Sequence, residues 1–93
     1  MKAIALCLII TVALAVTAFA NPWDDGYQAG WATGCMHWTS DLKEITGGAL
    51  QKEALGTFDF DVQNGTLPAS ARDQFLNGFI TGYPKGYKDH CRR

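Results

Sequence analysis

The sequence predicts an all-α fold: one small helical domain over residues 21–93, stapled by a disulfide. Three observations support this fold class. Large side chains recur at steps of three and four around two glycine-rich segments, two cysteines remain once an export signal is removed, and no pair of alternating segments exists to form a sheet. We expect two main helices joined by an irregular connector, with room for one short extra helix.

The first twenty residues are typical of a cleaved signal peptide. Met1-Lys2 supplies a positive start, an apolar run follows over 3–16, and Ala18-Phe19-Ala20 gives the small-x-small cleavage pattern. We therefore expect residues 1–20 to be removed and the protein to be exported, to a bacterial periplasm or into the medium. The alternative is an uncleaved anchor, because residues 3–20 just reach the length that spans a bilayer.

Two cysteines stay in the exported chain. Cys7 leaves with the signal peptide, so Cys35 and Cys91 form an even pair in an oxidising compartment. A bridge between them closes most of the chain and restricts the unfolded state by roughly 4 kcal/mol on the chain-entropy model. The alternative is that Cys35 is free and buried as a small hydrophobic residue.

Composition bounds the size of the core and the class of partner. The chain has 93 residues, a net charge of −1 and 12% aromatic residues. Aromatic rings bury much area each, so one small core is feasible despite the short chain. The basic residues near the C-terminus are too few for a nucleic-acid surface, so we expect no nucleic-acid partner.

The first helix is predicted from the spacing of its large side chains. It should begin near Asp24-Asp25, whose charges suit a helix N-terminus, and Gly47-Gly48 should end it. Its apolar stripe is Trp23, Tyr27, Trp31, Cys35, Trp38, Leu42 and Ile45. A tryptophan stripe with this spacing is more often core than a sugar-binding surface, so we expect these rings inside.

The connector is predicted to be mixed. Residues 49–55 can form two helical turns that Gly56 stops, and residues 58–62 alternate as a strand does before an Asn64-Gly65 turn. A single strand has no partner in so short a chain. We expect an extended segment that packs Phe58 and Phe60 under the helices, the alternative being an edge open to another molecule.

The second helix is predicted from a strict four-residue repeat. Pro68 suits its first turn, and Ser70 with Asp73 resembles a capping box. Pro84 should kink or end the helix near residues 81–83, because it removes a backbone donor and clashes with the preceding turn. The stripe is Leu67, Ala71, Phe75, Phe79, Tyr83, Tyr87 and Cys91.

The two helices share an internal repeat, Gly-aromatic-x-x-Gly-aromatic-x-x-Gly. Each copy places three glycines along one ridge, which predicts that something packs close to the backbone there. An antiparallel match of the ridges leaves the cysteines at opposite ends. Either the ridges do not face each other in that way, or the segment after Pro84 folds back, or the helices run side by side. The glycines are Gly26, Gly30, Gly34, Gly78, Gly82 and Gly86.

Candidate chemistry is sparse. Cys35, His37, His90 and Cys91 could ligate zinc, but a disulfide flanked by surface histidines is the favoured interpretation. The calcium-loop pattern fails when counted from Asp59, and a pair of catalytic carboxylates with Asp61 would need an apolar pocket. We therefore expect no enzyme, no cofactor and no metal.

Asn64-Gly65-Thr66 satisfies the glycosylation acceptor pattern, which we interpret as a plain turn in a bacterial protein.

One segment carries a family resemblance. Residues 75–83 read F-L-N-G-F-I-T-G-Y, which resembles an aromatic-glycine helix of small exported bacterial proteins. Two families are similar in this way, the Rap1a/Tai immunity proteins, which neutralise secreted toxins, and the HdeA-type acid-stress chaperones. The resemblance implies a small, helical, exported and disulfide-bonded protein. It assigns no functional residue to this chain.

Two functional hypotheses follow. The first is an exported helical protein that binds another protein, as an immunity protein, inhibitor or chaperone does. The second is a membrane-active or self-assembling protein, because small-x-x-x-small faces let helices associate without a hydrophobic driving force. Membrane contact is the less favoured of the two.

Overall fold

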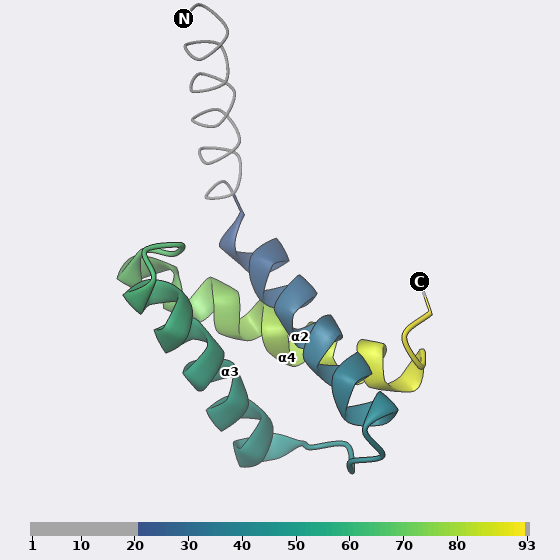
Figure 1. The fold of residues 1–93 in the computed structure, drawn as a ribbon. Coiled ribbons are helices and arrows are strands. Elements are labelled where there is room, and N and C mark those ends of the chain that lie inside the picture. Colours follow the sequence, from purple (N-terminus) through teal and green to yellow (C-terminus); the bar gives the residue numbers. More distant parts are fainter. Residues whose placement is uncertain (1–20, 93) are drawn as a thin grey trace, which may run out of the picture.

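The computed structural model describes residues 21–92, and this part of the chain contains three α-helices. They are α2 (Pro22–Thr39), α3 (Gly47–Gln63) and α4 (Arg72–Lys88), and a 3-10 turn, η1 (Ala69–Ala71), precedes α4. Within this range there is no strand, and Cys35 is bonded to Cys91, so the predicted all-α, disulfide-stapled domain is confirmed. Figure 1 shows α4 crossing behind α2, with α3 beside them. The predicted signal peptide, residues 1–20, lies outside the described residues.

α2 and α4 run parallel and pack backbone to backbone along a glycine seam. A Cβ atom placed on Gly30 would overlap the carbonyl oxygen of Phe79 and lie 2.9 Å from its carbonyl carbon. The same holds at both ends of the seam, where Gly26 meets Phe75 and Gly86 meets Trp31. Only glycine fits such positions, because any side chain would force the two backbones apart. We call the contact made by Gly26, Gly30, Gly34, Gly78, Gly82 and Gly86 the seam.

The seam has an internal two-fold relation. Gly30 meets the carbonyl of Phe79, and Gly82 meets the carbonyl of Tyr27. Each residue of α2 therefore plays the part of the residue 52 places later in α4, since 27 corresponds to 79 and 30 to 82. This is the reciprocity that a two-fold axis imposes on two identical chains. Here one chain supplies both halves of the contact.

α3 covers one face of the α2–α4 pair and creates the core. Phe75, Phe79 and Tyr83 are fully buried beneath it. The rings of Phe58 and Phe75 lie 5.6 Å apart, which joins α3 to α4. The described core consists of Leu50, Ala54, Phe58, Leu67, Ala71, Phe75, Leu76, Phe79 and Tyr83.

The matching aromatic row of α2 stays outside the core. A two-fold axis between parallel helices exchanges the faces of the pair, so Trp23, Tyr27 and Trp31 belong to the face away from α3. Trp23 is 38% exposed and stacks on Tyr27, with ring centroids 5.3 Å apart, and Trp31 is half-buried. The expectation that the tryptophan stripe forms the core is therefore wrong. The stripe packs beside the seam, and α4 supplies the buried rings.

All three helices end in the same hydrogen-bonded cap. At the end of α2, Leu42 N–H donates to His37 C=O and Asp41 N–H donates to Trp38 C=O, with Asp41 at φ 58°. This pair of bonds with a left-handed residue is the Schellman motif. α3 repeats it with Gly65 and α4 with His90. The first helix therefore ends at Thr39, not at the predicted Gly47-Gly48, which instead begin α3.

The connector differs from the prediction. The predicted extended segment 58–62 is the last part of α3, which continues through Gly56 to Gln63. Phe58 faces the core, but Phe60 is 65% exposed, so only one of the two rings packs under the helices. Alternating apolar and acidic residues matched a strand period here, while tertiary packing of the stripe Leu50, Ala54 and Phe58 selected the helix.

α4 also departs from the prediction at both ends. Its N-cap is Ala71 with no side-chain cap hydrogen bond, so the Ser70 capping box does not form. The helix continues through Pro84 to Lys88. Gly86 against the backbone of Trp31 and the Cys35–Cys91 bond hold these last turns on α2 and offset the cost of the proline.

Candidate functional site

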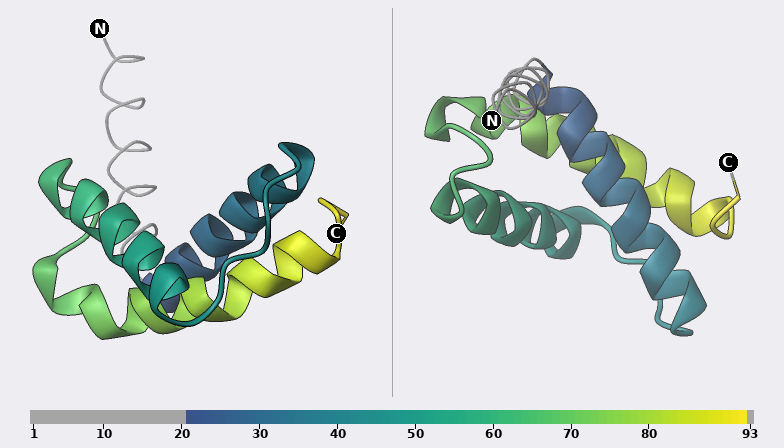
Figure 2. Two further views of the ribbon diagram at one scale, coloured as in Figure 1. Left: turned by 90° about the horizontal axis from the view of Figure 1, so that it is seen from below. Right: turned by 45° about the horizontal axis from the view of Figure 1, so that its top comes forward.

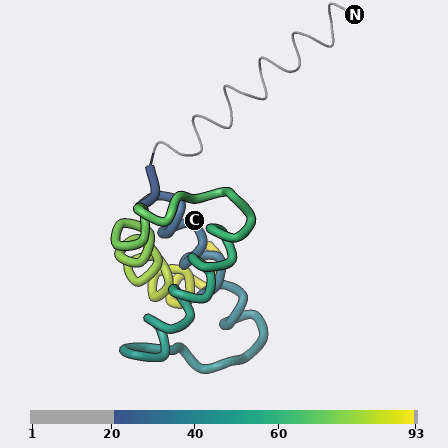
Figure 3. The backbone as a smooth tube through the Cα atoms, turned by 90° about the vertical axis from the view of Figure 1, so that its left-hand side faces the viewer, coloured from purple at the N-terminus to yellow at the C-terminus, as the bar shows by residue number. Residues whose placement is uncertain are grey.

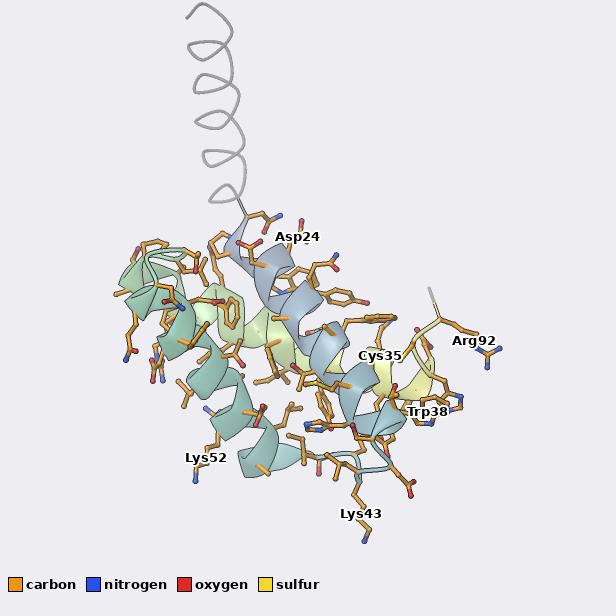
Figure 4. The ribbon with its side chains drawn as sticks, in the orientation of Figure 1. Asp24, Cys35, Trp38, Lys43, Lys52 and Arg92 are labelled. Carbon is orange, nitrogen blue, oxygen red and sulfur yellow. A yellow bond between two sulfur atoms is a disulfide. The ribbon has the colours of Figure 1, made fainter. Side chains whose placement is uncertain are left out.

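The disulfide joins α2 and α4 at the C-terminal end of the seam. Cys35 and Cys91 have Cα atoms 4.9 Å apart, at the last turns of α2 and just beyond α4. Because α2 and α4 are parallel, both cysteines lie at the C-terminal end of the pair. Of the arrangements that the sequence left open, the structure therefore has the helices side by side in the same direction. Figure 4 shows the bond where the ends of the two helices meet. The seam is therefore closed by a covalent bond at one end and by backbone packing along its length.

The two histidines serve packing. His90 stacks on Trp38 with ring centroids 4.3 Å apart, and His37 Nδ1 lies 2.6 Å from the Tyr83 hydroxyl. No group of three metal-ligating side chains occurs in the described part of the chain.

Tyr83 links three parts of the fold through one hydroxyl. It accepts a hydrogen bond from Ile45 N–H at 3.1 Å and can donate its own hydrogen to His37 Nδ1. Burial raises the pKa of Tyr83, so the hydroxyl stays protonated and keeps this donor. Tyr87 adds a second tie by donating to Leu42 C=O at 2.6 Å. Together these bonds hold the α2–α3 connector, which loops round one end of the molecule in Figure 3.

The connector and α3 border an open groove, which we call the α2–α3 groove. α2 and α3 rise from α4 as two arms of a V in the left view of Figure 2. The groove measures about 730 Å³. Its lining combines apolar or small residues with three polar ones: Ile45, Ala49, Gly56, Thr57 and Phe60, together with His37, Lys52 and Glu53.

Gly56 is the residue of this groove that the fold itself does not explain. It lies inside α3, where glycine costs about 1 kcal/mol relative to alanine. Nothing lies within 4 Å of a Cβ atom placed on it. The sequence predicts a helix stop at Gly56, because it does not show whether a glycine faces a backbone or open space.

Carboxylates gather at the end of the groove where α2 begins and α3 ends. Asp25 and Asp61 line a second, smaller hollow of about 300 Å³ with Thr66 and Leu67. Burial raises the pKa of both carboxyls, and the negative charges of Asp24 and Asp61 raise that of Asp25 further. Asp61 also lies in the last turn of its helix, where the helix dipole disfavours negative charge.

Other candidates from the sequence lie apart from this hollow. Asp59 is exposed on α3, and Asn64 forms the C-cap of that helix, immediately before the left-handed Gly65. Within residues 21–92 the one ion pair closer than 4.0 Å joins Arg72 to Asp73, both at the start of α4. Asp25 and Asp61 therefore have no cationic side chain against them in the described chain.

No protein-family model, curated protein or solved structure matches this chain. Among the described helices, none is long and apolar enough to cross a membrane.

Proposed function

We propose that this chain is an exported binding protein that recognises another protein through the α2–α3 groove. The observation that carries the proposal is the open groove beside a rigid frame, with Phe60 65% exposed and Gly56 facing open space. Exposed large apolar side chains beside a groove are typical of surfaces that bind a partner helix. An immunity protein, an inhibitor or a chaperone would use such a surface.

The self-assembling glycine-zipper alternative has less support. All six repeat glycines are buried in the seam, where each meets backbone atoms of the facing helix. Glycines engaged within one chain are not offered to a second chain or to lipid. The disulfide supports export, because such bonds persist in oxidising compartments.

Affinity capture from the cell envelope and the medium tests the proposal. The bait is the exported protein in its oxidised form, and the matched control is the Gly56→Leu variant. Leucine has room at this position and should fold, but it would occupy the groove. We expect a protein that the wild type captures in stoichiometric amount and the variant does not. Identical captures by the two baits would contradict a role of the groove in binding.

A further inference from the structure

We propose that the occupant of the α2–α3 groove is a basic amphipathic helix of another protein, with lysine or arginine near one end. This inference rests on the proposed function and adds the chemistry of the partner. It follows from two observations made on different residues: the open space over Gly56, with apolar side chains in the same groove, and the carboxylates without a cationic partner at its end.

The middle of the groove fits a helix that approaches closely. In the seam, each of the six glycines lies where the backbone of the facing helix comes within contact distance. Gly56 is also a glycine inside a helix, but no atom of another segment lies within 4 Å of a Cβ placed on it. A partner helix crossing α3 at Gly56 would use the vacant space, with Phe60 and Ile45 on either side to contact its apolar stripe.

The end of the groove selects the charge of that helix. Asp25 and Asp61 face one another without a cation, and Asp24 adds a third negative charge beside them. Lys52 lines the groove at its other end, where Glu53 also lines it, and Figure 4 shows both Lys52 and Lys43 at the end opposite Asp24. Burial and then repulsion from Asp24 and Asp61 raise the pKa of Asp25, so a lysine or arginine of the partner would stabilise its charged form, whereas an acidic helix would add to the repulsion.

The charge distribution also argues against a second copy in the groove as an isologous pair. In a two-fold contact with its axis across the groove, the acidic end of each copy would meet a single lysine of the other copy, Lys52, and Glu53 beside it in the groove offsets that charge. A separate protein with a basic helix meets both requirements.

The test uses three synthetic helical peptides with one leucine stripe and lysine, glutamine or glutamate at every polar position. Each is titrated into the oxidised, ¹⁵N-labelled exported protein, and the amide shifts of Ile45, Gly56 and Thr57 are followed by NMR. We expect the lysine peptide to shift these amides and to bind at least about tenfold more tightly than the glutamine peptide. The glutamate peptide should not bind.

Matched variants locate the effect. The Asp25→Asn/Asp61→Asn double variant should lose that tenfold preference, while Asp41→Asn/Asp89→Asn, with the same change in net charge, should keep it. Gly56→Leu should abolish binding of every peptide. Equal binding of the lysine and glutamine peptides at Gly56 would overturn the basic partner yet leave groove binding in place.

Two further outcomes would also overturn the proposal. One is binding of the lysine peptide that leaves the Gly56 amide unshifted, which would mean attraction to acidic surface elsewhere. The other is a Gly56 shift that depends on protein concentration without peptide, which would assign the groove to a second copy. The capture experiment fails or succeeds independently, because it does not depend on the charge of the partner.

Discussion

In the seam every glycine faces the backbone of another helix, whereas Gly56 in α3 faces open space. The seam is continuous, parallel and closed by a disulfide. α3 is held by one row of apolar side chains and by the hydroxyls of Tyr83 and Tyr87 on its connector. Glycine therefore lets two helices pack closely in one region and leaves a surface open in the other.

A second contrast lies within the seam itself. The two-fold relation pairs Phe79 of α4 with Tyr27 of α2, yet only Phe79 is fully buried because α3 covers one face alone. Phe79→Ala should lower the free energy of unfolding by about 4 kcal/mol, against about 1 kcal/mol for Tyr27→Ala. Urea denaturation followed by circular dichroism measures both. Equal losses would show that the two faces are equally packed.

Reduction of the disulfide removes the covalent link between α2 and the end of α4. Reduction of Cys35–Cys91 should cost about 4 kcal/mol, because the unfolded chain regains the freedom of a loop that spans most of the domain. The check is thermal unfolding with and without reductant, using the Cys35→Ser/Cys91→Ser variant to exclude effects of the reductant itself. An unchanged midpoint would mean that backbone packing alone sets the stability.

Glycine replacement compares the two regions directly. Gly30→Ala should destabilise the protein by about 3 kcal/mol, since its Cβ meets the backbone of Phe79, which no rotamer change can move. Gly56→Ala should instead stabilise it by about 1 kcal/mol, through helix propensity alone. Both are measured by urea denaturation. A stabilised Gly30→Ala would refute the close contact of the helices.

Loss of one hydroxyl should loosen α3 and leave the seam intact. Tyr83→Phe removes the acceptor for Ile45 N–H and should cost about 1–2 kcal/mol. A local effect would show as faster hydrogen exchange of the Ile45 amide, with unchanged exchange of the amides in the middle of α2. Faster exchange throughout the chain would show that the connector and the seam unfold together.

The smallest effect concerns the carboxylates at the end of the groove. The pKa of Asp61 is raised above its ordinary value of 3.8, so the folded state holds the proton more tightly than the unfolded state does. Stability from this group therefore falls as pH rises through the window between the two pKa values, and stays lower above it. Asp61→Asn should raise the unfolding midpoint slightly at pH 7 and lose that advantage below pH 3.8. A lower midpoint at pH 7 would contradict the raised pKa.

The sequence predicted the all-α fold and the disulfide because both follow from local signals: aromatic spacing and an even number of cysteines. It did not settle the direction of the helices, which depends on how Cys35 and Cys91 combine with the glycine ridges in three dimensions. The prediction of an extended segment over residues 58–62 was wrong, because these residues are helical. Their two-residue alternation competes with the four-residue spacing of Leu50, Ala54 and Phe58, which form the buried face of α3.

The candidate site was harder to predict than the fold. Gly56 and the pairing of Asp25 with Asp61 depend on tertiary placement, since nothing in the local sequence says which glycine meets a backbone. From the sequence, Asp61 is a candidate calcium ligand or catalytic carboxylate together with Asp59, which lies two residues before it. Its neighbour in space is Asp25, on the other arm of the groove.

The most direct test of the parallel glycine seam is the nuclear Overhauser effect between α-protons of facing residues. The structure predicts cross-peaks from Gly30 to Phe79 and from Gly82 to Tyr27, because at each pair the backbones are in contact. Observing both would establish the register and its two-fold relation in one experiment. Their absence, or cross-peaks between Gly26 and Gly86 as an antiparallel pair would give, would contradict the account.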